Sequence, residues 1–430
     1  MSRPEEWLSF INSGRGEAAL GQLYGRRPEI VRQQQARYSA LIEKFRGLYP
    51  GESEMELFSS PGRTEVCGNH TDHNGGRVLA AAVDLDIAAA VSKTGDGLIT
   101  LNSEGYPPLV IDTRQLDPVL QERFTSAALG RGVCAGIGKA GGTLGGFKAC
   151  LTSSIPKGSG LSSSAAFEML VAVILNELYN GGRFSPVTMA QFGQQAEDRY
   201  FGKPSGLMDQ TTIAVGGFVT IDFKELAAPV VRKVKYDFAS SGYALVIMET
   251  GGNHADLTDE YAAAANEMKA VALALGGKLL RDVTREKLLA NVAGLRQQQI
   301  SDRAILRALH YFADDQRVVD EVQALEEGRF QRFLDLVNES GRSSWMLLQN
   351  CYSAADPAHQ GIPLALALTE LRLRTRGAWR VHGGGFAGTI QVFLPADQVT
   401  EYVAALETVF GKGACHPVLV RQAGTVMIKR

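Results

Sequence analysis

We expect a short polar segment near the start of the chain, residues 62–76, to form one loop, and it carries side chains that could do chemistry. Its sequence is GRTEVCGNHTDHNGG, and five potential metal ligands fall within nine residues: Glu65, Cys67, His70, Asp72 and His73. Cysteine and histidine are preferred zinc ligands, so a zinc site is one interpretation. The adjacent glycines and Arg63 are poor neighbours for a cation. A mixture of donors and acceptors also suits a polyhydroxylated ligand, and we favour this second interpretation.

A glycine- and serine-rich segment, PKGSGLSSSAA at residues 156–166, predicts a phosphate-binding loop. Small residues leave backbone N–H groups free, and the apolar helix that we expect to begin at the serines directs its positive dipole end to the same space. Ser162, Ser163 and Ser164 add hydroxyls, and Lys157 adds a positive charge. An ordinary helix N-cap needs a single serine, so the run of small and hydroxyl residues favours phosphate binding.

Two further segments carry candidate functional groups. AEDRYFGKPSGLMDQ (196–210) places Glu197 on a predicted helix and Asp209 after a Pro-Gly turn, where a carboxylate can also merely cap the turn. HGGGFAG (382–388) has more glycines than a hairpin needs, which indicates close approach of backbone to a ligand. GIGKAG (136–141) matches the dinucleotide-binding fingerprint but lacks its strand–turn–helix context.

The elements that must position these groups mix hairpins with helices, which predicts an α+β fold. We expect a helix at 29–48, two strands joined as a hairpin through TGDG (94–97), and a strand–turn–strand unit at 210–223. The pattern changes near residue 228. The sequence therefore predicts two domains, 1–228 and 229–430.

Composition narrows the class of protein. The chain has 430 residues, 45% hydrophobic and 21% charged, with a formal charge of −2, so it can form two cores. Its charges are interspersed, which argues against nucleic-acid or membrane partners. The N-terminus lacks a signal-peptide profile, and the dispersed cysteines favour a reducing compartment, so we expect a cytoplasmic protein. The cysteines are Cys67, Cys134, Cys150, Cys351 and Cys415.

Residues 61–74, 156–166 and 382–388 resemble, in this order, the three signature motifs of the GHMP kinases, the galacto-, homoserine, mevalonate and phosphomevalonate kinase superfamily. The galactokinase branch is the better match. GLMDQ looks like its catalytic aspartate segment, AEDRYFGKPSG like its magnesium-binding helix, and GGNHADLTDEY like the stretch ending in its substrate tyrosine, Tyr261. The resemblance spans nearly the whole chain. It implies a two-domain fold whose N-terminal domain has a left-handed crossover and whose C-terminal domain is ferredoxin-like.

The same resemblance implies Mg²⁺-dependent transfer of the ATP γ-phosphoryl group to the anomeric hydroxyl of galactose. Asp209 would take or orient the proton of that hydroxyl, Arg63 would stabilise the developing charge, and Ser164 with Glu197 would hold Mg²⁺. The expected ATP-binding residues are Lys157, Gly158, Ser159, Gly160, Leu161, Ser162, Ser163 and Ser164. The expected sugar-binding residues are Glu65, Asn69, His70, Asp72, Tyr261, Gly384 and Gly385.

The chain departs from the family pattern at the sugar segment. Galactokinases usually carry glutamate where this chain has Asn69, and asparagine where it has Glu65. The usual tyrosine after the aspartate is His73, and Ala387 replaces a glycine of the third motif. In the family that glutamate contacts the sugar near its C6 hydroxyl, so an amide at 69 would not repel a uronic acid. The retained Asp72 indicates a galacto-configured sugar.

Three functions therefore remain open at this point. The first is galactokinase, and the second is a sugar 1-kinase for galacturonate, N-acetylgalactosamine or arabinose. The third is a sensor that binds sugar and ATP without turnover, which fits poorly with a complete set of phosphoryl-transfer residues. In each case the expected partners are a small sugar and ATP, and we expect a monomer.

Overall fold

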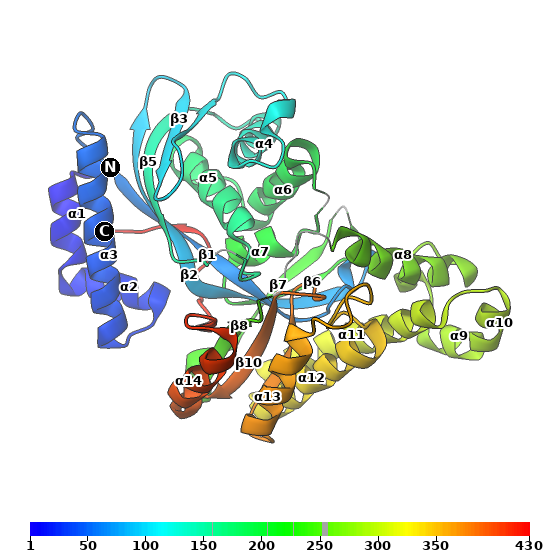
Figure 1. Ribbon diagram of the computed structural model, residues 1–430. Coiled ribbons are helices and arrows are strands. Elements are labelled where there is room, and N and C mark those ends of the chain that lie inside the picture. Colours follow the sequence, from blue (N-terminus) through cyan, green and yellow to red (C-terminus); the bar gives the residue numbers. More distant parts are fainter. Residues whose placement is uncertain (157, 204, 227, 252–256) are drawn as a thin grey trace.

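The computed structural model describes residues 1–430 apart from residues 157, 204, 227 and 252–256. Its described strands form two sheets (Figure 1). The larger sheet has the order β12-β1-β2-β5-β3-β4, and β6 and β7 extend it from β2. The smaller sheet has the order β11-β8-β10-β9.

The strands of the larger sheet are β1 (Glu56–Cys67), β2 (Arg77–Thr94), β3 (Leu98–Ser103), β4 (Leu109–Asp112), β5 (Gly146–Ser153), β6 (Phe218–Asp222), β7 (Val230–Val234) and β12 (Val426–Met427). Those of the smaller sheet are β8 (Tyr243–Glu249), β9 (Ala378–His382), β10 (Thr389–Pro395) and β11 (Cys415–Val418). The pairs within the smaller sheet are antiparallel.

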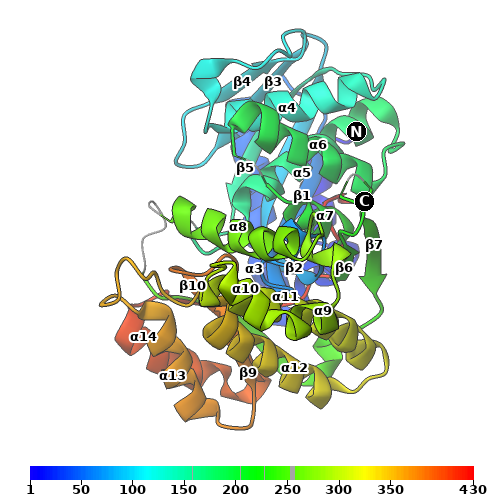
Figure 2. The same cartoon turned by 90° about the vertical axis from the view of Figure 1, so that its right-hand side faces the viewer.

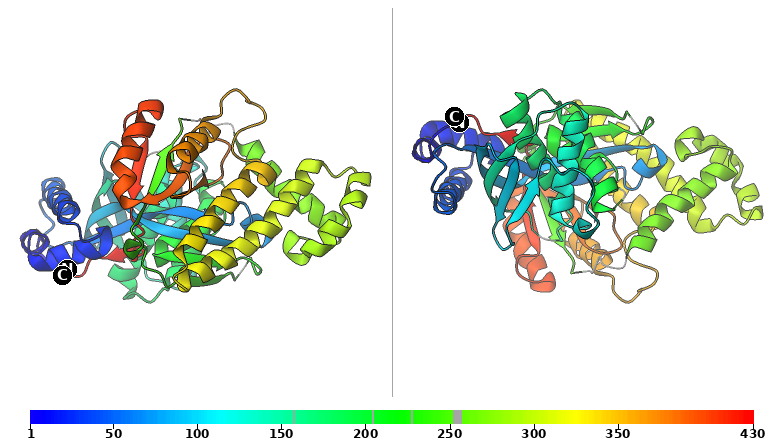
Figure 3. Two further views of the ribbon diagram at one scale, coloured as in Figure 1. Left: turned by 90° about the horizontal axis from the view of Figure 1, so that it is seen from below. Right: turned by 90° about the horizontal axis from the view of Figure 1, so that it is seen from above.

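The helices before β8 are α1 (Pro4–Ile11), α2 (Gly14–Tyr24), α3 (Pro28–Leu48), α4 (Ser126–Lys139), α5 (Ser163–Asn180), α6 (Pro186–Ala196) and α7 (Met208–Val215). Those after β8 are α8 (Thr258–Ala274), α9 (Arg285–Ala290), α10 (Val292–Gln297), α11 (Asp302–Glu326), α12 (Phe330–Ser343), α13 (Gly361–Leu373) and α14 (Val399–Phe410). Figure 2 shows α4 to α6 above the central strands and α11 to α14 below them. Helices α1 to α3 lie at one end of the molecule, and α9 and α10 lie at the other (Figure 3).

Strand β2 is buried on both faces, which explains its nearly continuous apolar sequence. Ala88 and Ala90 pack against helices α1 to α3 in a core that includes Trp7. Ala89 and Val91 belong to the main core with the apolar side chains of α5. The two-residue period of the strand separates these sets, so one strand joins two cores.

The family architecture expected from the sequence is confirmed. Strands β3 and β5 pair in parallel, and β4 and α4 form the connection between them. The smaller antiparallel sheet is covered on one face by α13 and α14. No helix in the described part of the chain combines the length and apolar character needed to cross a membrane.

Three local predictions were wrong. The polar segment is not one loop, because β1 continues through Cys67 and the turn begins only at Gly68. Strands β2 and β3 do not form a hairpin, because β5 lies between them. The first part of 210–223 is helical, in α7, although its threonine, isoleucine and valine favour a strand. Packing of Ile213 and Ala214 into the main core outweighs that weak local preference.

The division of the chain near residue 228 stays a prediction. Strand β7 follows that point and still pairs with β6 of the larger sheet. Near the end of the chain, β12 returns to pair with β1. The larger sheet thus takes strands from both sides of the predicted boundary.

Candidate active site

Arg63 and Asp209, the two predicted catalytic residues, are in direct contact although they are far apart in the sequence. Arg63 comes from β1 and Asp209 from the first turn of α7. Arg63 Nε donates to Asp209 Oδ1 at 2.6 Å, and Nη2 donates to Oδ2. Arg63 Nη1 donates to the Gly160 carbonyl, and the Ser162 hydroxyl donates to Asp209 Oδ2 at 2.6 Å. Three segments therefore meet at one carboxylate.

This arrangement determines the ionisation of Asp209. Burial by itself would raise the pKa of Asp209, but the charge and hydrogen bonds of Arg63, helped by Ser162, outweigh burial and hold the pKa below its usual value. The carboxylate is therefore ionised near neutral pH and can accept a proton or a hydrogen bond. A carboxylate of low pKa is a weak base, so it suits orientation of a hydroxyl and late acceptance of its proton.

The glycine-serine loop, residues 158–164, has the backbone of an anion-binding loop. Gly158 and Gly160 have positive φ values of 79° and 71°, and Ser162 has a left-handed φ of 61°. Ser162 lies at the N-cap of α5 but makes no side-chain cap hydrogen bond, because its hydroxyl is directed at Asp209. The N–H groups in the first turn of α5 thus lack the usual cap and can donate hydrogen bonds to an anion.

The other residues of this loop have different surroundings. Ser159 is buried, and its hydroxyl donates to the Pro156 carbonyl at 2.9 Å, so it stabilises the loop. The backbone N–H of Arg63 donates to the Leu161 carbonyl at 3.0 Å, which joins the loop to β1. Lys157, predicted to contact phosphate, lies outside the described residues.

Ser164 and Glu197, the predicted magnesium ligands, lie together. The Ser164 hydroxyl is 3.4 Å from Glu197 Oε1. Glu197 begins a five-residue π-helical turn, Glu197–Phe201, that follows α6. Hydroxyl and carboxylate oxygens are the hard donors that Mg²⁺ prefers, and Mg²⁺ commonly takes one or two protein carboxylates together with substrate phosphates. The two groups therefore fit this ion.

Sequence reasoning missed Glu168, which lies four residues after Ser164 on α5. Burial, followed by the negative charge of Glu197, raises the pKa of Glu168 well above its usual value. Its Oε2 accepts a hydrogen bond from Gln210 Nε2 at 3.0 Å. An acidic residue within an otherwise apolar helix, four positions from a predicted ligand, was the available signal.

The polar turn, residues 68–74, follows β1 directly. His70 has a left-handed φ of 59°, and its Nε2 donates to the Gly384 carbonyl at 2.8 Å. Burial lowers the pKa of His70 to about 4, so the ring is neutral. The ring of Tyr261 stacks on it, with the centroids 6.2 Å apart. Asp72 lies against the segment before α7, since a Cβ at Gly206 would be 2.7 Å from Asp72 Oδ2.

Gly384 and Gly385 are required by packing between protein groups. A Cβ at Gly384 would lie 2.4 Å from Tyr261 Cε1. At Gly385, where φ is 80°, a Cβ would lie 2.2 Å from the Asn350 carbonyl oxygen. The Tyr261 hydroxyl donates to the Gly385 carbonyl at 3.2 Å. These glycines therefore position Tyr261 and His70, in addition to any contact they make with a ligand.

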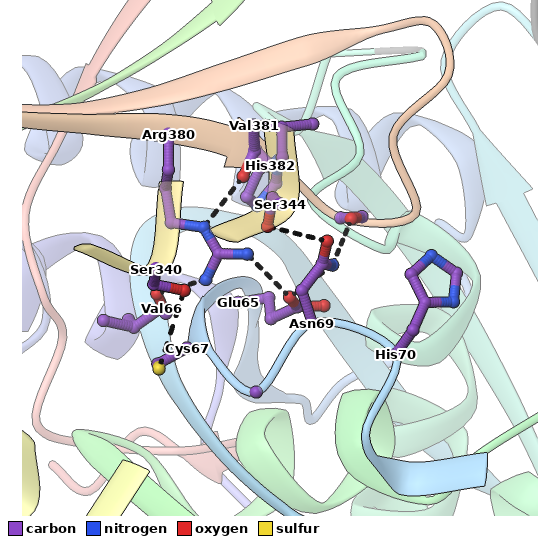
Figure 4. Close-up of polar contacts among 12 residues, drawn as sticks. Glu65, Val66, Cys67, Asn69, His70, Ser340, Ser344, Arg380, Val381 and His382 are labelled. Atoms are coloured by element: carbon purple, nitrogen blue, oxygen red, sulfur yellow. Dashed lines mark hydrogen bonds and ion pairs between the residues drawn. The ribbon is translucent and has the colours of Figure 1, made fainter. Parts of the chain in front are cut away.

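The side chains of Glu65 and Asn69 meet each other (Figure 4). Asn69 Nδ2 donates to Glu65 Oε1 at 2.8 Å. Arg380 of β9 lies on the other side of Glu65, with Nη2 3.6 Å from Oε1. The two residues whose types differ from the family pattern thus form one buried group.

Helix α11 holds the backbone of the polar turn, which sequence reasoning also missed. Asp314 is fully buried, and its Oδ2 accepts hydrogen bonds from the N–H groups of Gly68 and Asn69 at 3.1 and 3.0 Å. His310 Nε2 donates to the Asn69 carbonyl at 2.9 Å. A histidine and an aspartate four positions apart on the apolar face of a helix were the signal in the sequence.

The ligands of the alternative zinc interpretation point in different directions. Cys67 Sγ donates to the hydroxyl of Ser340 at 3.8 Å, on α12. The ring of His73 lies 6.2 Å from that of His70 and is about half exposed. In the described parts of the chain, no three Cys, His, Asp or Glu side chains are grouped so that they could hold a metal ion.

Two family models match the chain. The "GHMP kinases N terminal domain" matches residues 128–217, and the "Galactokinase galactose-binding signature" matches residues 43–93. The galactokinase of Streptomyces coelicolor is 32% identical over 372 residues, which cover 86% of this chain and 92% of that protein. The galactokinase of Lactococcus lactis is 28% identical over 402 residues, covering 90% and 95% of the two chains.

Solved structures agree with these relationships. A crystal structure of Lactococcus lactis galactokinase complexed with galactose superimposes with a TM-score of 0.75 at 25% identity, over 91% of this chain and 99% of that chain. A mevalonate kinase from Methanococcus jannaschii has the same fold, with a TM-score of 0.58 at 16% identity, over 85% and 98% of the chains. This chain therefore belongs to the galactokinase family of the GHMP kinases.

Proposed function

We propose that the protein phosphorylates galactose with ATP at the anomeric hydroxyl, giving galactose 1-phosphate and ADP. The observation that supports this proposal is the junction of Arg63, Asp209 and Ser162. It lies between an uncapped helix N-terminus and a turn rich in hydrogen-bonding groups. The first suits a phosphate chain and the second suits a sugar, and an ionised carboxylate lies where the two would meet.

In the proposed reaction the anomeric oxygen attacks the γ-phosphorus, the bond from that phosphorus to the bridging β–γ oxygen breaks, and ADP leaves. Asp209 orients the attacking hydroxyl and accepts its proton. Arg63 stabilises negative charge on the attacking oxygen and the phosphoryl group. Phosphoryl transfer depends mainly on positioning and charge neutralisation, so few residues suffice. The N–H groups at the start of α5 bind the phosphates.

Ser164 and Glu197 would hold Mg²⁺, which neutralises phosphate charge when bound. Burial and the neighbouring Glu197 raise the pKa of Glu168, which disfavours a second negative charge beside this pair. His70, Asp72 and Tyr261 would form hydrogen bonds or packing contacts with the sugar.

A coupled ADP-release assay tests the function. We expect galactose-dependent ADP release, compared across galactose, N-acetylgalactosamine, galacturonate, arabinose and glucose. Asp209→Asn should lower kcat by about 10²- to 10⁴-fold, the range for loss of a proton-transfer group. Asp335→Asn, on the exposed side of α12, is the matched control and should retain wild-type turnover.

Two results would contradict parts of the proposal. Full turnover in Asp209→Asn, with the fold intact, would exclude this residue as the proton acceptor. No ADP release with any sugar, despite binding of sugar and ATP, would instead support the sensor function. Oligomeric state is a separate question, and the monomer stays a prediction.

A further inference from the structure

Glu65 is a carboxylate with one oxygen occupied and the other open. Its Oε1 accepts the hydrogen bond from Asn69 and faces Arg380 at 3.6 Å. Its Oε2 accepts no hydrogen bond from the described residues. This oxygen is also not fully buried. The residue as a whole is 6% exposed. The exposed part of Glu65 therefore includes an oxygen that can accept a hydrogen bond.

Asn69, by contrast, has no capacity left for a ligand. Its Nδ2 donates to Glu65 Oε1 at 2.8 Å and to the Gly383 carbonyl at 2.7 Å, which uses both amide protons. Its Oδ1 accepts from Asn350 Nδ2 at 2.6 Å and from the Ser344 hydroxyl at 3.5 Å. The residue is fully buried (Figure 4). Asn69 thus connects β1, the third glycine motif and the end of α12, and presents nothing to a sugar.

Glu65 belongs to the sugar side of the proposed active site. Arg63, two positions earlier on β1, donates a hydrogen bond to Asp209. Residues two apart on a strand lie on the same face, so Glu65 lies on the face of β1 that carries Arg63. The charged groups that act on Glu65 are Arg380, Asp72 and Arg63. Two of these belong to the predicted catalytic and sugar-binding sets. Figure 4 shows Glu65 between Arg380 and Asn69, with His70 beyond Asn69.

We propose that Glu65, and not Asn69, is the specificity-determining carboxylate: its free oxygen accepts a hydroxyl of the bound sugar and excludes sugars that carry a carboxylate at that position. This inference rests on the proposed sugar-kinase function. Because the Asn69 amide is 2.8 Å from Glu65 Oε1, the negative charge lies beside position 69 although the residue there is neutral. Like charges brought together in a desolvated site disfavour binding strongly.

Protonation of Glu65 provides a second means of testing the proposal. Burial, only partly offset by Arg380 and Asn69, raises the pKa of Glu65 to about 7. Discrimination against an anionic sugar should therefore be strong at about pH 8 and weak at about pH 6. Asp72 and Arg63 also face Glu65. Their charges are present in both the wild type and Glu65→Gln, so comparing the two proteins at the same pH isolates the effect of the Glu65 charge.

The experiment compares kcat/KM for galactose, galacturonate and galacturonamide, the last being a neutral probe of the same size as galacturonate. Glu65→Gln retains an acceptor oxygen for Asn69 but removes the charge. At about pH 8 we expect this variant to raise the galacturonate-to-galactose ratio about tenfold or more, and to leave the galacturonamide-to-galactose ratio unchanged. In the wild type, the galacturonate ratio should rise as the pH falls through about 7, and the variant should show no such change.

Several results would overturn the inference. A galacturonate ratio unaffected by Glu65→Gln, accompanied by a lower melting temperature, would show that Glu65 is only a structural partner of Arg380. A galacturonate-to-galactose ratio that does not change with pH in the wild type would also overturn the inference, and this measurement needs no variant. Absence of galactose turnover in the wild type would instead refute the proposed function, so the two failures can be told apart.

Discussion

Asp314 lies on α11 and contacts the backbone of the polar turn. We expect it to be essential to the sugar side of the active site. Its Oδ2 accepts two backbone hydrogen bonds from the turn, and its Oδ1 accepts one from Arg317 Nη1 at 2.9 Å. Asp314→Asn has nearly the same shape but only one acceptor oxygen. If that oxygen faces the turn, the amide N–H groups face the Arg317 guanidinium. Both groups are hydrogen-bond donors, so the bond to Arg317 is lost.

The size of the effect follows from burial. Asp314 is fully buried, and removing one partner of a buried ion pair typically costs about 3–5 kcal/mol. We therefore expect the free energy of unfolding of Asp314→Asn to fall by this amount. Hydrogen bonds to a charged group contribute about 1.5–3 kcal/mol. Loss of the hydrogen bonds between the turn and the Asp314 carboxylate should therefore lower kcat/KM for the sugar by about 10- to 100-fold. The KM for ATP should stay nearly constant, because α5 makes no hydrogen bond to Asp314.

Urea unfolding and steady-state kinetics measure both effects. Asp320→Asn on the same helix is the control, since among the described residues Asp320 accepts only a surface hydrogen bond, from Gln316. The change in its free energy of unfolding should stay within about 0.5 kcal/mol. Loss of stability without a change in sugar kinetics would refute the argument that α11 positions the turn. Equal stability of the two variants would refute the argument about burial.

Three further predictions concern the same site. Gly158→Ala has space for its Cβ, but its positive φ should lower the free energy of unfolding by about 1–3 kcal/mol and raise the KM for ATP. Gly385→Ala, by contrast, places its Cβ 2.2 Å from a backbone oxygen and should abolish soluble expression. Ser162→Ala removes a hydrogen bond from Asp209, so kcat should fall about tenfold and the acidic limb of its pH profile should move to higher pH. The pKa of Glu65 is raised from 4.5 to about 7, so protonated Glu65 stabilises the fold below pH 4.5 and this contribution is lost as the pH rises through about 7. In urea titrations, Glu65→Gln should therefore gain stability relative to the wild type between about pH 5 and about pH 8.

The family resemblance, and not composition, implied that Arg63 and Asp209 belong to one site, and the structure places the two side chains in contact. Composition alone left Asp209 as either a functional carboxylate or a turn cap. The sequence predicted α5 for a physical reason: a long apolar run follows residues that favour a helix start. It could not predict that α7 is a helix, because four of its eight residues are β-branched and what they pack against decides their conformation. The hydrogen bonds that the turn donates to Asp314 join residues 245 and 246 positions apart, and local patterns contain no information about such contacts.

In the polar segment, residue types and spacing did not reveal how the side chains lie relative to one another. Four positions separate Glu65 from Asn69, and the chain reverses between them at Gly68. There φ is 90°, and a Cβ would lie 2.3 Å from the Arg77 carbonyl oxygen. This close approach brings the Asn69 amide onto the Glu65 carboxylate. The apparent move of a carboxylate from 69 to 65 is therefore small in space. If the sugar responds to where the charge lies, then restoring the usual order with a Glu65→Asn, Asn69→Glu double variant should retain discrimination against galacturonate, whereas Glu65→Gln should lose it.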